Sequence, residues 1–302
     1  MQSIKALSIT PDARDWLTNS RHPRILHVFD HACNLINERR EILSVVTQQI
    51  GNGPFNLVIP RLPEYLNLHA KRPISNAANQ LNLGDLTINT VNAKLWSPRP
   101  DWERLHAMRD HITQLLLTNH QKCCGLPLRG LRDMPFAQTA QGYSTTSLNP
   151  NLPITEYQFS NSLISALANA DLSSSLTATP KIAGLGIGLT PAGDDFILGA
   201  VLAAWIIHPP EIASVLAQEI TNTAVPLTTS LSAAWLKSVG KGEAGILWHN
   251  FFNALITGDS SAIQLQINKL LSIGHTSGVD ALAGFIRVFI SFKEHILSPC
   301  PS

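Results

Sequence analysis

A glycine-rich stretch followed by two adjacent aspartates is the part of this sequence with the clearest potential for chemistry. Residues 183–199 read Ala-Gly-Leu-Gly-Ile-Gly-Leu-Thr-Pro-Ala-Gly-Asp-Asp-Phe-Ile-Leu-Gly. Thr190 followed by Pro191 predicts the start of a helix, with the threonine as its N-cap. The free N–H groups and the positive dipole end of such a start bind anions. We therefore expect this loop to hold a phosphate or a carboxylate.

Asp194 and Asp195 fall in the first turn of this predicted helix, where bare carboxylates would repel an anion. Two arrangements would remove the conflict: a divalent cation between carboxylate and ligand, or an aspartate acting as a base or hydrogen-bond partner. Aspartates that only complement the helix dipole are a third interpretation. The run over residues 196–207 is apolar on all sides and predicts a buried helix. No Gly-Lys-Ser/Thr run follows the glycines, so we expect no nucleotide cofactor.

A second loop repeats the first. Residues 274–280 have the same Gly-x-Thr-x-x-x-Asp spacing as residues 188–194, and both loops precede an apolar stretch with an early glycine. Because glycine, threonine and aspartate are common at helix starts, chance is one explanation of the repeat. The alternative is that two similar loop–helix corners converge on one ligand.

These corners define the candidate site. The catalytic candidates are Asp194, Asp195, His275 and Asp280. The three aspartates are also candidate ligands of Mg²⁺ or another divalent cation. The candidate contacts to an anionic substrate are Gly186, Gly188, Thr190, Gly193, Thr276, Ser277, Gly278 and His27. His27 belongs to a histidine cluster for which we favour structural or surface roles, with a ligand contact or a metal site as alternatives.

The elements that must position these residues predict an α+β protein. Short β-branched segments at 54–60 and 85–91 indicate strands, whereas 24–36 and 41–49 do not settle between strand and helix. After a Pro-rich break at 97–100, apolar residues recur at helical spacing. The predicted helical segments are 102–116, 191–207, 210–223, 228–239, 243–257, 260–272 and 278–296. We therefore expect a β-rich N-terminal region at 1–97 and a mainly helical domain at 101–298.

Composition limits the possible functions. Lys and Arg number 22 against 21 Asp and Glu, so the net charge of +1 gives no electrostatic basis for binding nucleic acid. The apolar runs are shorter than the roughly twenty residues of a membrane-spanning helix. The four cysteines lack metal-ligand spacing, and together these features predict a cytoplasmic protein that contacts no membrane. Charged residues make up only 14%, which indicates either a neutral polar surface or a surface covered by partner subunits.

The runs over residues 186–196 and 274–284 resemble the two signatures of the AllH/YahE family, which contains a subunit of oxamate carbamoyltransferase. Residues 22–35 are similar to a third segment of that family. The resemblance implies a subunit of a multi-subunit enzyme with AllF-like and AllG-like partners, which converts oxalurate and phosphate to oxamate and carbamoyl phosphate in anaerobic allantoin catabolism. The Ser-Thr-Arg-Thr phosphate loop of well-known transcarbamoylases is absent from this sequence.

Three hypotheses remain at this point. The chain is a catalytic or co-catalytic subunit of such a complex, or a structural or regulatory subunit whose glycine loops only pack or bind an effector. The third is a stand-alone phosphate- or metal-dependent enzyme that acts on another small ureido or carboxylate anion. The low content of charged residues favours the first two, because it is typical of a surface that partners cover.

Overall fold

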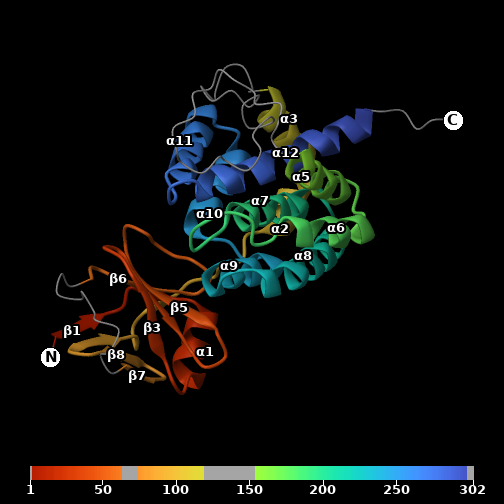
Figure 1. Ribbon diagram of the computed structural model, residues 1–302. Coiled ribbons are helices and arrows are strands. Elements are labelled where there is room, and N and C mark those ends of the chain that lie inside the picture. Colours follow the sequence, from red (N-terminus) through yellow and green to blue (C-terminus); the bar gives the residue numbers. More distant parts are fainter. Residues whose placement is uncertain (1, 63–73, 119–153, 298–302) are drawn as a thin grey trace. The chain divides into compact units, whose positions relative to one another are not determined.

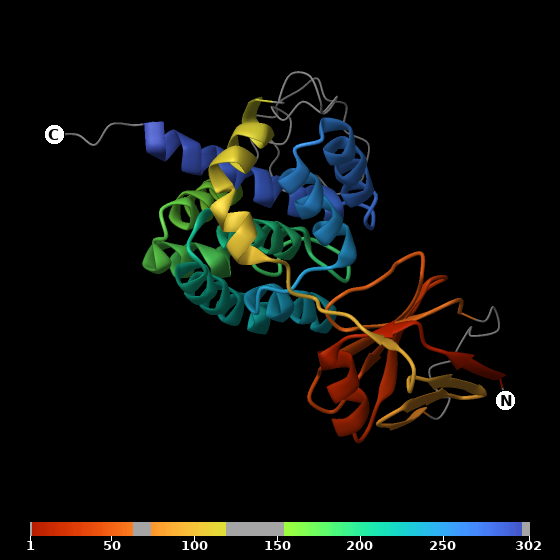
Figure 2. The same cartoon turned by 180° about the vertical axis from the view of Figure 1, so that it is seen from behind.

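A computed structural model describes residues 2–62, 74–118 and 154–297 (Figures 1 and 2). The chain divides into two compact units. The first consists of Met1–Pro100 and Glu243–Ile246, and the second consists of Asp101–Gly242 and Leu247–Ser302. In the described residues, no helix is long and apolar enough to cross a membrane.

The first unit contains two β-sheets and one helix, α1 (Pro11–Asn19). Its strands are β1 (Gln2–Lys5), β2 (Ser8–Ile9), β3 (Arg24–Val28), β4 (Ala32–Ile36), β5 (Ile42–Thr47), β6 (Asn56–Ile59), β7 (Ile74–Ala77), β8 (Gln80–Leu83), β9 (Leu86–Asn89) and β10 (Lys94–Leu95). The larger sheet has the order β10-β2-β6-β5-β4-β3, and the smaller sheet has the order β1-β9-β8-β7. Pairing in each sheet is mixed, with β5 parallel to β6 and antiparallel to β4.

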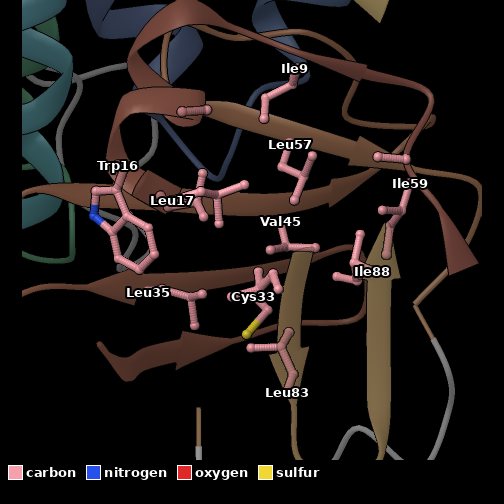
Figure 3. Close-up of a cluster of buried hydrophobic side chains, with 14 of the residues drawn as sticks. Ile9, Trp16, Leu17, Cys33, Leu35, Val45, Leu57, Ile59, Leu83 and Ile88 are labelled. Carbon is pink, nitrogen blue, oxygen red and sulfur yellow. The ribbon is translucent and has the colours of Figure 1, made fainter. Parts of the chain in front are cut away.

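Both sheets and α1 contribute side chains to one hydrophobic core (Figure 3). Trp16 and Leu17 come from α1, Leu35 comes from the larger sheet, and Leu83 comes from the smaller one. Burial of such apolar surface is the main stabilising contribution to a unit of this kind. Cys33 lies in the same core, and its burial raises the pKa of the thiol to about 12.

The second unit is helical. Its helices are α2 (Trp102–Ala107), α3 (Arg109–Thr118), α5 (Ile154–Ala168), α6 (Leu172–Ala178), η1 (Thr179–Lys181), α7 (Ala192–Ile207), α8 (Pro210–Ala224), η2 (Val225–Leu227), α9 (Ser230–Gly240), α10 (Ile246–Thr257), α11 (Ser260–Leu271) and α12 (Ser277–Leu297). All residues of α7 are buried, as the apolar run over 196–207 predicts for the larger part of the helix. Figures 1 and 2 show α7 inside the helical unit, where α12 is its most extensive partner.

The α+β prediction is confirmed, since a β-rich N-terminal part precedes a mostly helical C-terminal part. Of the ambiguous segments, 24–36 forms the β3–β4 pair and 41–49 contains β5. The helical period over 102–116 is divided between α2 and α3, because α2 ends at Met108 as its C-cap. The helix predicted from residue 243 begins only at Ile246. The residues before it return to the first unit, where the N–H group of Ala244 donates to the Pro98 carbonyl at 2.8 Å.

Candidate functional site

The first turns of α7 and α12 lie together because the two helices touch at their backbones. A Cβ atom on Gly199 would overlap the carbonyl oxygen of Ala281, and one on Gly284 would overlap that of Phe196. Only glycine allows this approach on both helices. The early glycine that follows each repeated loop, Gly199 or Gly284, therefore has a packing role, and this packing brings the two predicted corners together.

The hydroxyl groups of Thr190 and Ser277 join the corners, with their oxygen atoms 2.9 Å apart. The prediction that Thr190 caps α7 is wrong. Pro191 occupies the N-cap position with no side-chain cap, and its carbonyl accepts the N–H groups of Asp194 and Asp195 at 2.9 and 3.1 Å. The hydroxyl of Thr190 bonds to Ser277 because α12 brings a second hydroxyl within reach, which the local sequence does not reveal.

Asp194 anchors the glycine-rich loop. Its Oδ1 accepts the N–H group of Gly184 at 2.7 Å, and its Oδ2 accepts the hydroxyls of Ser232, at 2.7 Å, and Thr228. Only 1% of the residue is exposed. A buried carboxylate is stabilised by several donors of this kind. Asp194 therefore ties the glycine loop and the start of α9 to α7, and its oxygens are engaged by the fold.

Asp195 has a different environment although it is the next residue. It is 8% exposed, and burial raises the pKa of its carboxyl to about 8. Hydrogen bonds from Ser277 and Thr190 oppose this shift, while the like charges of Asp280 and Asp194 add to it. At neutral pH Asp195 is consequently a protonated acid beside Asp280, which is 1% exposed in the first turn of α12.

The metal site expected from Asp194, Asp195 and Asp280 stays a prediction. No group of three or more His, Cys, Asp or Glu side chains suited to a metal ion occurs among residues 2–62, 74–118 and 154–297. Both oxygens of Asp194 accept hydrogen bonds from the chain, and a metal ion would have to displace the proton of Asp195.

The glycine-rich loop presents its tip to solvent. Gly186 and Gly188 have φ of 114° and 101°, which side chains rarely adopt, and Ile187 between them is 78% exposed. Within the part of the chain that the structure describes, the N–H groups of these three residues donate to no other protein atom. They adjoin the start of α7, where oriented amides and the helix dipole favour an anion.

Two of the other predicted anion contacts have packing roles. The N–H groups of Gly193 and Gly278 donate to the carbonyls of Leu185 and Ile273, at 2.9 and 3.2 Å. A Cβ atom at either glycine would overlap a backbone carbonyl, so the absence of a side chain is what allows the local contact. These N–H groups are not available to a ligand.

The remaining predicted residues lie at the edge of the site or in the other unit. His275 is exposed in the loop before α12, and the carbonyl of Thr276 accepts the N–H group of Asp280 at 3.0 Å. His27 belongs to β3 of the first unit and is half-buried. Its Nδ1 is buried without a hydrogen-bond partner among the described residues, and burial lowers the pKa of the ring.

Comparison with protein families gives two matches. The family described as oxamate carbamoyltransferase subunit AllH matches residues 182–289. The AllH family N-terminal domain matches residues 5–95. The chain belongs to the AllH family. The resemblance stated from the glycine-rich corners is thereby confirmed.

The matched regions contain every residue that the sequence singled out for this AllH-family chain. Residues 182–289 include both corners, and residues 5–95 include His27. No solved structure matches the chain. The site must therefore be interpreted from its own geometry.

Sequence reasoning missed the hydroxyl residues before α9. Thr228 and Ser232 donate to Asp194, and Thr229 caps α9 while its hydroxyl donates to the Leu189 carbonyl at 2.5 Å. The run Thr-Thr-Ser-Leu-Ser over residues 228–232 holds more hydroxyls than one helix cap requires. This excess of hydroxyl residues is the sequence feature that would have indicated their contact with Asp194.

A separate hollow of about 430 Å³ lies along α5 and α6 of this AllH-family chain. Asn161, Ser165, Asn169 and Asp171 are among its lining residues, and it includes no residue of either corner. The chemistry of the candidate site thus belongs to the meeting of α7 and α12.

Proposed function

We propose that this AllH-family chain is a subunit of an oxamate carbamoyltransferase that converts oxalurate and phosphate to oxamate and carbamoyl phosphate. Membership of the AllH family supports the subunit role. We further propose a cytoplasmic complex with AllF-like and AllG-like subunits, which acts in anaerobic allantoin and purine nitrogen catabolism. The observation that carries a catalytic role is the buried acid Asp195, held between the first turns of α7 and α12.

The reaction itself requires one proton to move. An oxygen of hydrogen phosphate forms a bond to the carbamoyl carbon of oxalurate, and the bond from that carbon to the inner nitrogen breaks. The proton of hydrogen phosphate ends on the nitrogen of oxamate, so charge and atoms balance without another reactant. A neutral acid next to a second carboxyl group can donate one proton and accept another in the same step.

Asp195 and Asp280 are the groups that we assign to this proton transfer. Asp195, protonated at neutral pH, donates to the leaving nitrogen. Asp280 accepts the phosphate proton and restores the starting state of the pair by returning it to Asp195. Thr190 and Ser277 orient the Asp195 carboxyl through their hydroxyls.

The glycine loop supplies the contact to an anion in this proposal. The N–H groups of Gly186, Ile187 and Gly188, which make no hydrogen bond within the described residues, bind phosphate or the substrate carboxylate. Oriented amides of this kind also stabilise negative charge that develops on the carbamoyl oxygen. No step in the proposal requires a divalent cation, and the assay tests for one.

The test is formation of carbamoyl phosphate from oxalurate and phosphate. The chain is assayed alone and then co-purified with AllF-like and AllG-like subunits, each with and without Mg²⁺. We expect activity in the complex and a loss of at least ~100-fold in kcat for Asp195→Asn, the range for removal of a general acid. Ser165→Ala, on the exposed surface of α5, is the matched control and keeps wild-type activity.

Other outcomes separate the hypotheses. Full activity of a complex that carries Asp195→Asn would make the chain a structural or regulatory subunit. Activity of the purified chain alone would favour a stand-alone enzyme. No carbamoyl phosphate in any mixture would refute oxalurate as the substrate, and other ureido acids would then be assayed.

A further inference from the structure

One oxygen of the Asp195 carboxyl lacks a hydrogen-bond partner. Its Oδ2 is buried and makes no such bond to any atom of residues 2–62, 74–118 and 154–297. The hydroxyls of Thr190 and Ser277, one from each corner, lie 2.9 Å apart beside the same carboxyl group. A buried polar atom without a partner is costly, and at a functional site it indicates a position that a ligand occupies.

The charges around this oxygen decide which ligand group fits. The groups that act electrostatically on Asp195 are Asp280 and Asp194, both of which raise its pKa. The carboxylate end of a ureido acid placed against Asp195 would add a further negative charge to this buried acidic corner. A neutral group with N–H donors meets no such repulsion and is attracted by the carboxyl oxygens.

The hydrogen-bonding capacity of the corner matches one class of neutral group. The buried Oδ2 of Asp195 lacks a hydrogen-bond donor, and an N–H group of a ligand would supply one. A carbamoyl group, –CO–NH₂, offers two N–H donors and one acceptor oxygen. Its N–H groups match this oxygen, whereas a methyl ketone or an acetyl group of the same shape leaves the oxygen unpaired.

We propose that Asp195 and Asp280 bind the carbamoyl end of the substrate. This pair of carboxyl groups then selects ureido compounds, and the glycine loop binds their anionic end. The inference rests on the proposed function for the identity of the substrate and adds its orientation. Asp194, although adjacent, does not take part because its oxygens are bonded to Gly184, Thr228 and Ser232.

Binding of matched pairs of probes to the purified full-length chain, and to its complex, tests the orientation by calorimetry at pH 7. The first pair is oxalurate and N-acetyloxamate, and the second is N-carbamoylglycine and N-acetylglycine. Within each pair the charge is equal and the shape is nearly equal, and only NH₂ is exchanged for CH₃. We expect the carbamoyl member to bind at least ~10-fold more tightly, because replacing its NH₂ group by CH₃ leaves buried acceptors unpaired.

The ratio of affinities within a pair is the readout, since structural damage weakens both members alike. Asp195→Ala is expected to bring the ratio close to one, and Asp280→Asn to lower it. Ser165→Ala, on the surface of α5, is expected to keep the wild-type ratio. Circular dichroism confirms that each variant is folded.

The outcomes distinguish this inference from the proposed function. Equal binding of the acetyl and carbamoyl members, or no binding of any probe, overturns the inference whatever the transferase assay shows. Selective binding of N-carbamoylglycine without binding of oxalurate supports the inference and refutes the proposed substrate. A ratio that Asp195→Ala leaves unchanged overturns the role of Asp195.

Discussion

Replacing Asp195 with asparagine tests whether this residue is a neutral acid in the folded protein. Burial raises the pKa of its carboxyl to about 8, whereas an unfolded aspartate titrates near ~3.9. Between these two pH values the folded chain holds a proton that the unfolded chain has released. The contribution of Asp195 to the free energy of unfolding is therefore fully present below pH ~4 and is lost as the pH rises towards 8. Asparagine carries no charge at any pH and removes this loss.

The expected magnitude follows from the width of this window. Each pH unit within it costs about 1.4 kcal/mol of unfolding free energy. From pH 5 to pH 8 the advantage of Asp195→Asn over the wild type should therefore grow by up to about 4 kcal/mol. The titratable groups that interact with Asp195 are Asp194 and Asp280, and both are present in the two proteins, so the difference reports Asp195 together with its coupling to them.

Urea unfolding at several pH values measures this difference. Circular dichroism at 222 nm reports the second unit, which holds most of the helices of the described chain. Ser232→Ala is the matched control, because it removes one donor to Asp194 and leaves Asp195 in place. We expect it to lower stability by about 1 kcal/mol at every pH.

The refuting result is a pair of parallel curves. If wild type and Asp195→Asn lose or gain stability equally from pH 5 to pH 8, Asp195 is ionised in the folded protein. Its role as a proton donor would then be wrong as well. A variant that is more stable at pH 8 and inactive in the transferase assay would instead show stability given up for function.

Three further predictions concern the surroundings of the site and the core of the first unit. Asp194→Ala leaves the buried hydroxyl of Ser232 and two partly buried donors without their acceptor, and should lower the free energy of unfolding in urea by about 3 kcal/mol. A loss below about 1 kcal/mol would contradict its role as an anchor. Gly284→Ala places a methyl group against the Phe196 carbonyl of α7 and should lower Tm by about 4–8 °C, and an unchanged Tm would refute the contact between the two backbones. Cys33 is buried and its thiol pKa is raised to about 12, so it should be alkylated at least ~100-fold more slowly in native protein than in urea. Mass spectrometry of its peptide measures the two rates, and rapid labelling of the native protein would contradict its place in the core.

Much of the local structure follows from short-range sequence patterns. The apolar run after Pro191 specified a buried helix, and the recurring apolar spacing beyond it specified the helices that follow. Two β-branched segments specified β6 and β9, whereas the other strands of the first unit carry no such signal or an ambiguous one. These features depend on side-chain period and backbone preference, which act between residues close in the chain. The repeated Gly-x-Thr-x-x-x-Asp spacing also identified the two corners that meet in space.

The roles of those residues depend on their neighbours in the folded chain. Asp194 and Asp195 are identical in type and adjacent in sequence, yet one accepts three hydrogen bonds from the fold and the other is a buried neutral acid. Their difference comes from the helices and loops that surround each carboxyl, namely the start of α9 on one side and the first turn of α12 on the other. Thr190 likewise bonds to Ser277 because α12 approaches closely at two glycines. Desolvation and hydrogen bonding depend on neighbours far away in the chain, so the ionisation of a carboxyl is a property of the packed molecule.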